Sequence, residues 1–208
     1  MTEQRKDLIV LVADSSTAEG LEALLQRHQS LRIKPISFDV RTYPQRDAGV
    51  FNRAHTYLTP FMKRYSYALV VLDYEGCGCE APGPETVSTD VQMRLDRSGW
   101  EGRSRVILIY PELDIWVWSD SPHVDRVLGW FGRKPTLREW LKSKELLRKG
   151  HPKPERPKEA RLAAMKQVGT RESSAIFEKL GSSVSVKRCT DPAFQLLLAT
   201  LREWFPPA

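Results

Sequence analysis

The chain has 208 residues and a formal net charge of +6, from 32 Lys and Arg against 26 Asp and Glu. It is long enough to bury a substantial core, and no stretch approaches the roughly 20 apolar residues of a membrane span, so we expect a cytoplasmic protein without membrane contact. The three cysteines exclude a disulfide-rich secreted scaffold, and the positive charge is compatible with nucleic-acid contact without requiring it.

Strand and helix patterns alternate as far as Tyr110. The segments expected to form strands are 8–12, 36–40, 68–72 and 106–110. The first intervening helix is predicted to begin at a capping box made by Ser16 and Glu19. The second carries an apolar stripe from Phe51 to Tyr65, which Pro60 should kink or delay, and a third covers 86–97. This order is typical of an α/β fold with a mostly parallel central sheet flanked by helices.

The last third of the chain changes to helical patterns. The predicted elements are helices over 136–147, 158–168 and 171–180, a short strand at 184–186, and a final helix that starts at Asp191-Pro192. We therefore expect an α/β core over 1–120 and a helix-rich C-terminal part over 121–208 that packs on it.

Much of the positive charge is concentrated in a proline-rich segment. Six basic residues and three prolines lie between Arg148 and Arg161. Such a composition is typical of a solvated connector, which we place at 148–158, with an arm that binds polyanions as the alternative.

Acidic residues follow two of the predicted strands. The apolar run 68–72 indicates a strand buried on both faces, and ligands gather beyond the carboxyl ends of such strands. Asp73 and Glu75 should point the same way, with alpha carbons about 7 Å apart, and Glu112 and Asp114 follow the next strand. Because Mg²⁺ prefers carboxylate oxygens, we predict Asp73, Glu75 and Glu112 as metal ligands, although acidic residues are also common at solvated strand ends.

Two further groups of residues favour less specific interpretations. Cys77-Gly78-Cys79 lacks the usual two-residue gap of a zinc site and has no second pair, so it indicates reduced thiols.

The middle of the chain is rich in aromatic residues: Trp116, Trp118, Trp130, Phe131 and Trp140. We expect some of them in the core and at least one partly exposed, which favours a protein interface, with base stacking as the alternative.

Three stretches carry a resemblance to a known family. They are Leu11-Val12 ahead of the Leu21-Glu22-Ala23-Leu24-Leu25 helix, then Leu69-Val70-Val71-Leu72-Asp73-Tyr74-Glu75-Gly76, and Pro111-Glu112-Leu113-Asp114-Ile115-Trp116. Together they resemble a Toprim-type domain of a small bacterial group related to RloB and to the nuclease half of OLD-family proteins. Pro152-Lys153 and Cys189-x-x-Pro192-x-Phe194 also have counterparts in an uncharacterised Toprim-like subgroup.

The chain departs from the family pattern at the site itself. In that pattern the first strand ends in Glu-Gly, an acidic residue opens the next helix, and the third strand ends in Asp-x-Asp. Here Ala13-Asp14, Thr17 and Asp73-Tyr74-Glu75 occupy those positions. The resemblance therefore implies a Toprim-like fold with an incomplete acidic site, in which Asp14 is the substitute for the missing glutamate.

Three functions follow from this resemblance and these departures. The first is an accessory component of a bacterial anti-phage defence system, set in a methylation-associated cluster, whose degenerate site binds one Mg²⁺ or none. Its partners would be other defence-system proteins, with nucleic acid as a further candidate. The second is an active Mg²⁺-dependent nuclease acting on DNA or RNA, with Asp14, Asp73, Glu75 and Glu112 as catalytic residues and Lys153 on the scissile phosphate. The third is a non-catalytic interaction scaffold.

Overall fold

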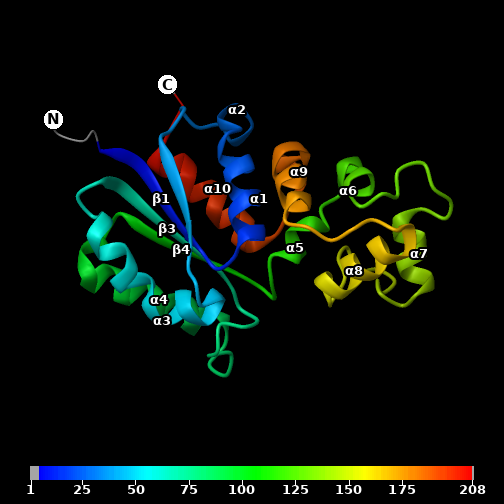
Figure 1. Cartoon of the computed structure of the whole chain (residues 1–208), viewed down its shortest axis with the longest axis horizontal. Coiled ribbons are helices and arrows are strands. Elements are labelled where there is room, and N and C mark those ends of the chain that lie inside the picture. The colour runs from blue at the N-terminus through cyan, green and yellow to red at the C-terminus, as the bar shows by residue number, and fades with distance from the viewer. Residues whose placement is uncertain (1–4, 208) are drawn as a thin grey trace.

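In the computed structural model, which describes residues 5–207, four parallel strands form one sheet in the order β2-β1-β3-β4 (Figure 1). The strands are β1 (Lys6–Val12), β2 (Phe38–Thr42), β3 (Tyr65–Asp73) and β4 (Ser104–Ile109). All three strand pairings are parallel, as between Val10 and Leu69 or Val71 and Ile107. The predicted α/β class with a parallel central sheet and a helical C-terminal part is confirmed.

Helices cover both faces of this sheet. Those in the first half of the chain are α1 (Ser15–Leu25), α2 (His28–Leu31), α3 (Arg46–Leu58) and α4 (Pro84–Leu95). The later ones are α5 (Asp114–Val117), α6 (Pro122–Val127), α7 (Leu137–Ser143), α8 (Pro157–Val168), α9 (Ala175–Ser183) and α10 (Pro192–Trp204). No helix among residues 5–207 is both long and apolar enough to cross a bilayer.

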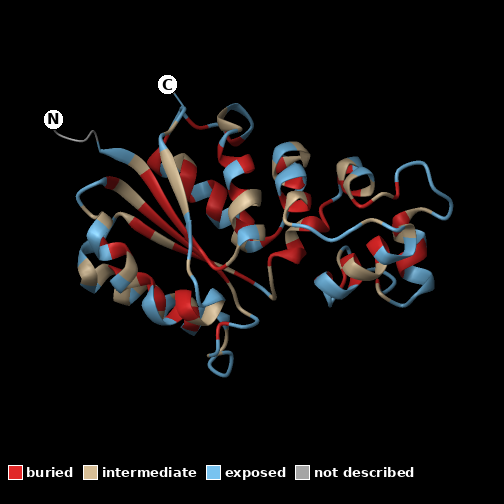
Figure 2. Ribbon diagram, in the orientation of Figure 1, coloured by how far each residue is buried: buried red, intermediate tan, exposed pale blue. Residues whose placement is uncertain are grey.

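The central strands β1 and β3 bury both of their faces because their apolar runs are not interrupted by polar side chains, whereas the edge strand β2, with the sequence FDVRT, has no buried residue. In β1, Leu8 and Val10 point into the apolar cluster that contains α1 and α10, whereas Ile9 and Leu11 point into the cluster that contains α3 and α4. Figure 2 shows the central strands as buried between these helical layers and β2 as intermediate to exposed. The result is a three-layer arrangement that leaves the ends of the strands as the accessible part of the sheet.

The C-terminal helices complete the layer on the α1 side. The ring of Tyr67 in β3 stacks on Trp204 of α10, with centroids 4.6 Å apart. Helix α9 lies against α1 so closely that a Cβ on Gly181 would come within 2.3 Å of the carbonyl oxygen of Gly20. Glycine at position 181 is therefore required by the close approach of the two helices.

Helices α6, α7 and α8 extend the molecule beyond the sheet (Figure 1). Two buried tryptophans tie this extension together, since the ring centroids of Trp130 and Trp140 are 5.0 Å apart and the Trp130 indole donates to the carbonyl of Ala164. The apolar cluster continues without a break from β1 to these helices.

The start of α1 differs from the predicted capping box. The helix begins at Ser15, and its N-cap is Asp14, whose Oδ1 accepts hydrogen bonds from the Thr17 amide at 2.8 Å and the Thr17 hydroxyl at 2.9 Å. Asp14 and Ser16 are both good N-cap residues, so the sequence pattern did not discriminate between them. The prediction of Ser16 as the cap was wrong.

Other boundaries were also misplaced. Tyr65 belongs to β3 and not to the preceding helix, because α3 ends at Leu58 and continues as a 3₁₀ turn over Thr59–Phe61 that contains Pro60. The predicted strand at 184–186 is absent from the described residues, and a 3₁₀ turn over Val186–Arg188 lies there. The predicted helix over 136–147 ends at Ser143.

Candidate acidic pocket at the strand ends

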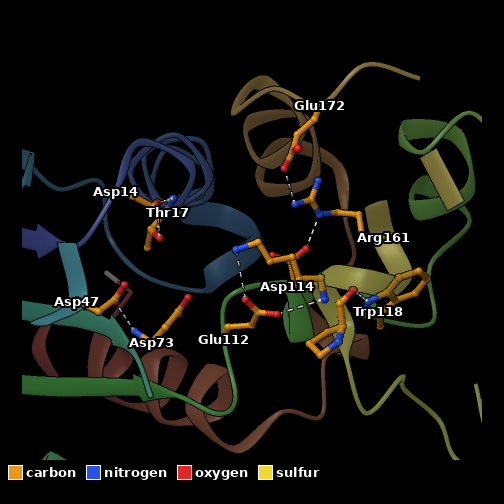
Figure 3. A network of polar contacts seen from close by, with 11 residues as sticks. Asp14, Thr17, Asp47, Asp73, Glu112, Asp114, Trp118, Arg161 and Glu172 are labelled. Carbon is orange, nitrogen blue, oxygen red and sulfur yellow. Dashed lines mark hydrogen bonds and ion pairs between the residues drawn. The ribbon is translucent and has the colours of Figure 1, made fainter. Parts of the chain in front are cut away.

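A pocket of about 260 Å³ lies at the carboxyl ends of the strands (Figure 3). The strand order places β2 on one side of β1, with β3 and β4 on the other, so the connection reverses direction between β1 and β3. Ligands of open parallel sheets bind at this reversal point. The pocket is lined by Asp14, Ser15, Ser16, Arg46, Asp73, Glu112, Leu113, Asp114, Lys158, Arg161, Glu172 and Phe177.

Three of the predicted site residues meet in this pocket. Asp14 follows β1, Asp73 ends β3, and Glu112 follows β4. They meet because the strands are parallel, which brings the carboxyl ends of β1, β3 and β4 to the same edge of the sheet. Asp14 also has a structural role, because its carboxylate caps the N-terminus of α1.

A fourth carboxylate, Asp47, lies next to Asp73. Asp47 is in the first turn of α3, and its Oδ1 accepts a hydrogen bond from the backbone amide of Asp73 at 2.7 Å. Sequence reasoning missed Asp47, although its position shortly after the end of β2 was a signal of the same kind as that used for Asp73.

The charges of these aspartates are not balanced by adjacent ion pairs. Burial raises the pKa of Asp73 well above its ordinary value, and the carboxylates of Asp47, Asp14 and Glu112 raise it further, while the Leu113 amide opposes the rise. Burial likewise raises the pKa of Asp47, against the effect of its hydrogen bond from Asp73. This side of the pocket therefore carries excess negative charge.

The acids that follow β4 are in the opposite situation, because each faces a cation from α8. Oε1 of Glu112 accepts the Lys158 amide at 3.3 Å, and Oε2 lies 3.8 Å from the Lys158 ammonium. Asp114 is buried and pairs with the buried guanidinium of Arg161, which also reaches Glu172 at 3.2 Å. Figure 3 shows this paired group apart from Asp14, Asp47 and Asp73.

The burial of Asp114 and the pairing of the basic segment both differ from the sequence-based interpretation. Asp114 follows β4, at the kind of strand end where acidic residues are commonly solvated, yet only 5% of it is exposed. Burial raises its pKa, and Arg161 opposes that rise. The basic residues near 148–161 were interpreted as a solvated connector, but Lys158 and Arg161 carry their charges into the pocket. Their acidic partners lie more than 40 residues earlier, so local composition could not reveal them.

Two predicted site residues lie outside the pocket lining. Glu75 is exposed, and its backbone amide donates to the carbonyl of Pro111 at 2.9 Å. Lys153 lies with its ammonium 3.8 Å from Asp191, the residue that caps α10. Glu75 is outside the pocket lining, although its charge helps to raise the pKa of Glu112. Its place in a ligand set with Asp73 and Glu112, and the contact of Lys153 with a phosphate, stay predictions.

One arginine at the pocket was not predicted. Arg46 lines the pocket and begins α3 with a φ of 52°, in the left-handed region that is rare for residues other than glycine. Such a conformation costs on the order of 1 kcal/mol or more. It is exposed, and no ion pair forms with it among residues 5–207.

The residues present fit a single hard cation better than a full metal centre. Within the described part of the chain, no group of three or more His, Cys, Asp and Glu is arranged to hold a metal ion. Mg²⁺, however, is often held by one or two carboxylates together with waters and ligand phosphates. Asp73 with Asp14 or Asp47 supplies oxygen donors of that kind, whereas Glu112 and Asp114 are occupied by Lys158 and Arg161.

Comparisons of the chain with protein families, with curated proteins and with solved structures find no match. The Toprim resemblance therefore stays a prediction.

Proposed function

We propose that the protein is an accessory component of a bacterial anti-phage defence system, with a degenerate Toprim-like pocket that binds at most one divalent cation. The pairing of Glu112 and Asp114 with Lys158 and Arg161 carries this proposal. Lys158 and Arg161 already neutralise three of the five acids that line the pocket, so the lining holds too little unpaired negative charge to favour two metal ions. The defence context rests on the resemblance of 69–76 and 111–116 to Toprim-type sequences.

The remaining charge supports one cation near Asp73. A divalent ion beside Asp73, Asp47 and Asp14 would relieve the repulsion that raises the pKa of Asp73 and Asp47. When bound, Mg²⁺ would supply a positive centre that holds a phosphate oxygen. Two-metal phosphodiester cleavage needs ions at both the attacking and the leaving oxygen, and the other carboxylates that line the pocket, Glu112, Asp114 and Glu172, are already paired with cations.

Cation binding is tested by calorimetry and by thermal unfolding with and without Mg²⁺ or Mn²⁺. A cation that binds only the folded protein raises the melting temperature, and we expect such a rise for the native chain but not for Asp73→Asn. Asp90→Asn is the matched control, since Asp90 pairs with Arg94 on the exposed side of α4. An equal rise in Asp73→Asn would place the cation elsewhere.

An active Mg²⁺-dependent nuclease is the alternative, and the convergence of Asp14, Asp73 and Glu112 in one pocket favours it. In that function Arg46 and Lys158, at the pocket wall, would face the phosphate in place of Lys153. Plasmid, linear DNA and RNA incubated with the protein and Mg²⁺ or Mn²⁺ separate the two functions. Cutting by the native chain that is lost in Asp73→Ala would establish the nuclease and refute the degenerate site.

The defence context is tested in cells. We expect that bacteria carrying the complete gene cluster resist phage, and that deleting this chain lowers the resistance. If the protein acts only as a scaffold without an ion, Asp73→Ala restores resistance fully in the deletion strain and the calorimetric signal is absent. Loss of resistance with Asp73→Ala, in a strain that still assembles the partners, supports the cation site.

A further inference from the structure

A second surface, far from the acidic pocket, combines an exposed ring with several cations. It lies at the end of α6 and on the loop between α6 and α7, which projects at the end of the molecule opposite the sheet (Figure 1). We call it the aromatic-basic tip and define it by Phe131, Arg126, Arg133 and Lys134. Phe131 is 64% exposed, more than any other large hydrophobic side chain among residues 5–207. The part of the loop after Trp130 is coloured as exposed in Figure 2.

The tip is held in place by its own hydrogen bonds. The Phe131 amide donates to the carbonyl of Asp125 at 3.1 Å, and the Arg133 side chain donates through Nε to the carbonyl of Gly129 at 2.8 Å. The neighbouring Trp130 is buried, with its indole bonded to Ala164. A residue as apolar as Phe131 is therefore presented to solvent by a fixed backbone, although its neighbour Trp130 is in the core.

The charged side chains of the tip are all positive, and the nearest carboxylate that one of them influences is Glu139, whose pKa Lys134 helps to lower. The Arg126 guanidinium lies over one face of Phe131, 4.7 Å from the centroid, while Arg133 and Lys134 are exposed beside it. Among residues 5–207 no ion pair forms with any of these three cations. The nearby carboxylate of Glu139 is engaged instead, since it accepts the Thr136 amide at 2.8 Å and the Thr136 hydroxyl at 2.9 Å.

We propose that the aromatic-basic tip binds single-stranded nucleic acid. An unpaired base stacks on the ring of Phe131, and the adjoining phosphates contact Arg133 and Lys134. Base stacking on an aromatic side chain next to cations is how proteins bind single strands with little sequence preference. Arg126 holds the ring from one side and adds a positive charge beneath the stacked base.

Other partners fit this surface less well. A protein interface needs a contiguous apolar centre within roughly 800 Å² on each partner, but the apolar residues next to Phe131 on the same elements, Leu128 and Trp130, are buried. A membrane surface would take up several apolar side chains on one helix face, and the tip offers a single ring. A single base matches the one exposed ring, and its phosphates match the exposed cations Arg133 and Lys134.

The test measures binding of fluorescently labelled single-stranded DNA and RNA to the full-length chain by anisotropy, in EDTA so that no metal site contributes. We expect Phe131→Ala to weaken binding at least about fivefold, the lower end of what one stacked base contributes, and Phe131→Trp to retain it. Arg133→Ala combined with Lys134→Ala should lower the slope of log affinity against log salt by about 1.4, because each single-strand phosphate contact contributes about 0.7.

The matched control removes two exposed cations elsewhere. Arg53→Ala combined with Lys63→Ala takes the same charge from the α3 side of the sheet, and we expect affinity within about twofold of the native chain. Asp73→Asn, which removes the proposed cation site, should bind the oligonucleotide as the native chain does, so a failure of the pocket proposal leaves this one standing.

Several outcomes would overturn the proposal. Native affinity in Phe131→Ala would show that no base stacks there. Equal losses in the two double variants would show only general attraction of a polyanion to a basic chain. Equal affinity for a duplex of the same length would exclude an unpaired base as the ligand. Binding to anionic vesicles or to an acidic protein in place of oligonucleotides would assign the tip to one of those partners.

Discussion

At the residue scale, the acidic side chains of the pocket differ in what neutralises them. Asp73 and Asp47 have raised pKa values, the hydrogen bond between them is donated by a backbone amide, and Arg46 is the cation that lowers the pKa of Asp47. Glu112 and Asp114 have cations in contact. An unneutralised group of half-buried carboxylates costs stability, and proteins keep such groups where a ligand uses them. This contrast between neighbouring acids makes Asp73 the most informative position for substitution.

We expect Asp73→Asn to stabilise the folded chain above acidic pH. The pKa of Asp73 is raised in the folded protein. The stability that depends on the protonated form of Asp73 is therefore fully present below the unfolded pKa of about 3.9. It is lost as the pH rises through the folded pKa. The amide never ionises, so the gain, about 0.5–2 kcal/mol, should appear as pH rises from 4 and then level off. Thermal unfolding across pH 4–8 measures it, and a gain that shrinks with rising pH would contradict the direction.

The buried pair of Asp114 and Arg161 should tolerate removal of one partner poorly. Arg161→Met would leave the Asp114 carboxylate in a buried site, where only 5% of the residue is exposed, without its cation. Such a loss costs about 3–5 kcal/mol. The control is Arg148→Ala, whose ion pair with Glu155 is exposed and should contribute less than about 1 kcal/mol. Denaturant titration gives both values, and similar small losses would show that the buried pair contributes little.

At the scale of elements, helix α1 places one carboxylate in two structural roles. Asp14 caps the helix and lines the pocket. We expect Asp14→Ala to lose about 1 kcal/mol, as for a missing N-cap, and Asp14→Ser to lose little, because serine also caps well. If Asp14 contributes to cation binding, both variants weaken it equally. Chemical unfolding and calorimetry on the same samples separate the two roles, and full cation affinity in Asp14→Ser would confine Asp14 to capping.

The elements that the sequence predicted well are those with an unbroken apolar pattern. The strands β1, β3 and β4 were located because a segment such as 68–72 has few alternatives once it must be buried on both faces. The convergence of Asp14, Asp73 and Glu112 followed from parallel pairing. The short helix α6 was not predicted, since its six residues are too few for a periodic pattern. The cations of α8 were missed because their acidic partners are distant in sequence.

At the scale of the whole molecule, the apolar cluster on the α1 side contains residues from both sides of the predicted boundary at residue 120. Leu69 and Ile107 of the sheet belong to the same cluster as Leu197 and Leu201 of α10. The cations of α8 reach back to the acids that follow β4 in the same way. The C-terminal part therefore supplies both the cover of one sheet face and the counter-ions of the pocket.

We therefore expect a fragment that ends at Asp120 not to fold on its own. Without α10 it loses the stacking of Trp204 on Tyr67 and exposes one face of β3 and β4. Circular dichroism during heating should show no cooperative transition, and a dye that binds apolar surface should bind the fragment and not the full chain. Trp204→Ala in the full chain removes only the stacking contact. We expect it to lower the free energy of unfolding by about 3–5 kcal/mol, and each kcal/mol should lower the melting temperature by roughly 2–4 °C for a chain of this size. A sharp transition in the fragment would instead show that residues up to 120 form an independent folding unit, because only a sheet with its own closed core can unfold cooperatively without α10.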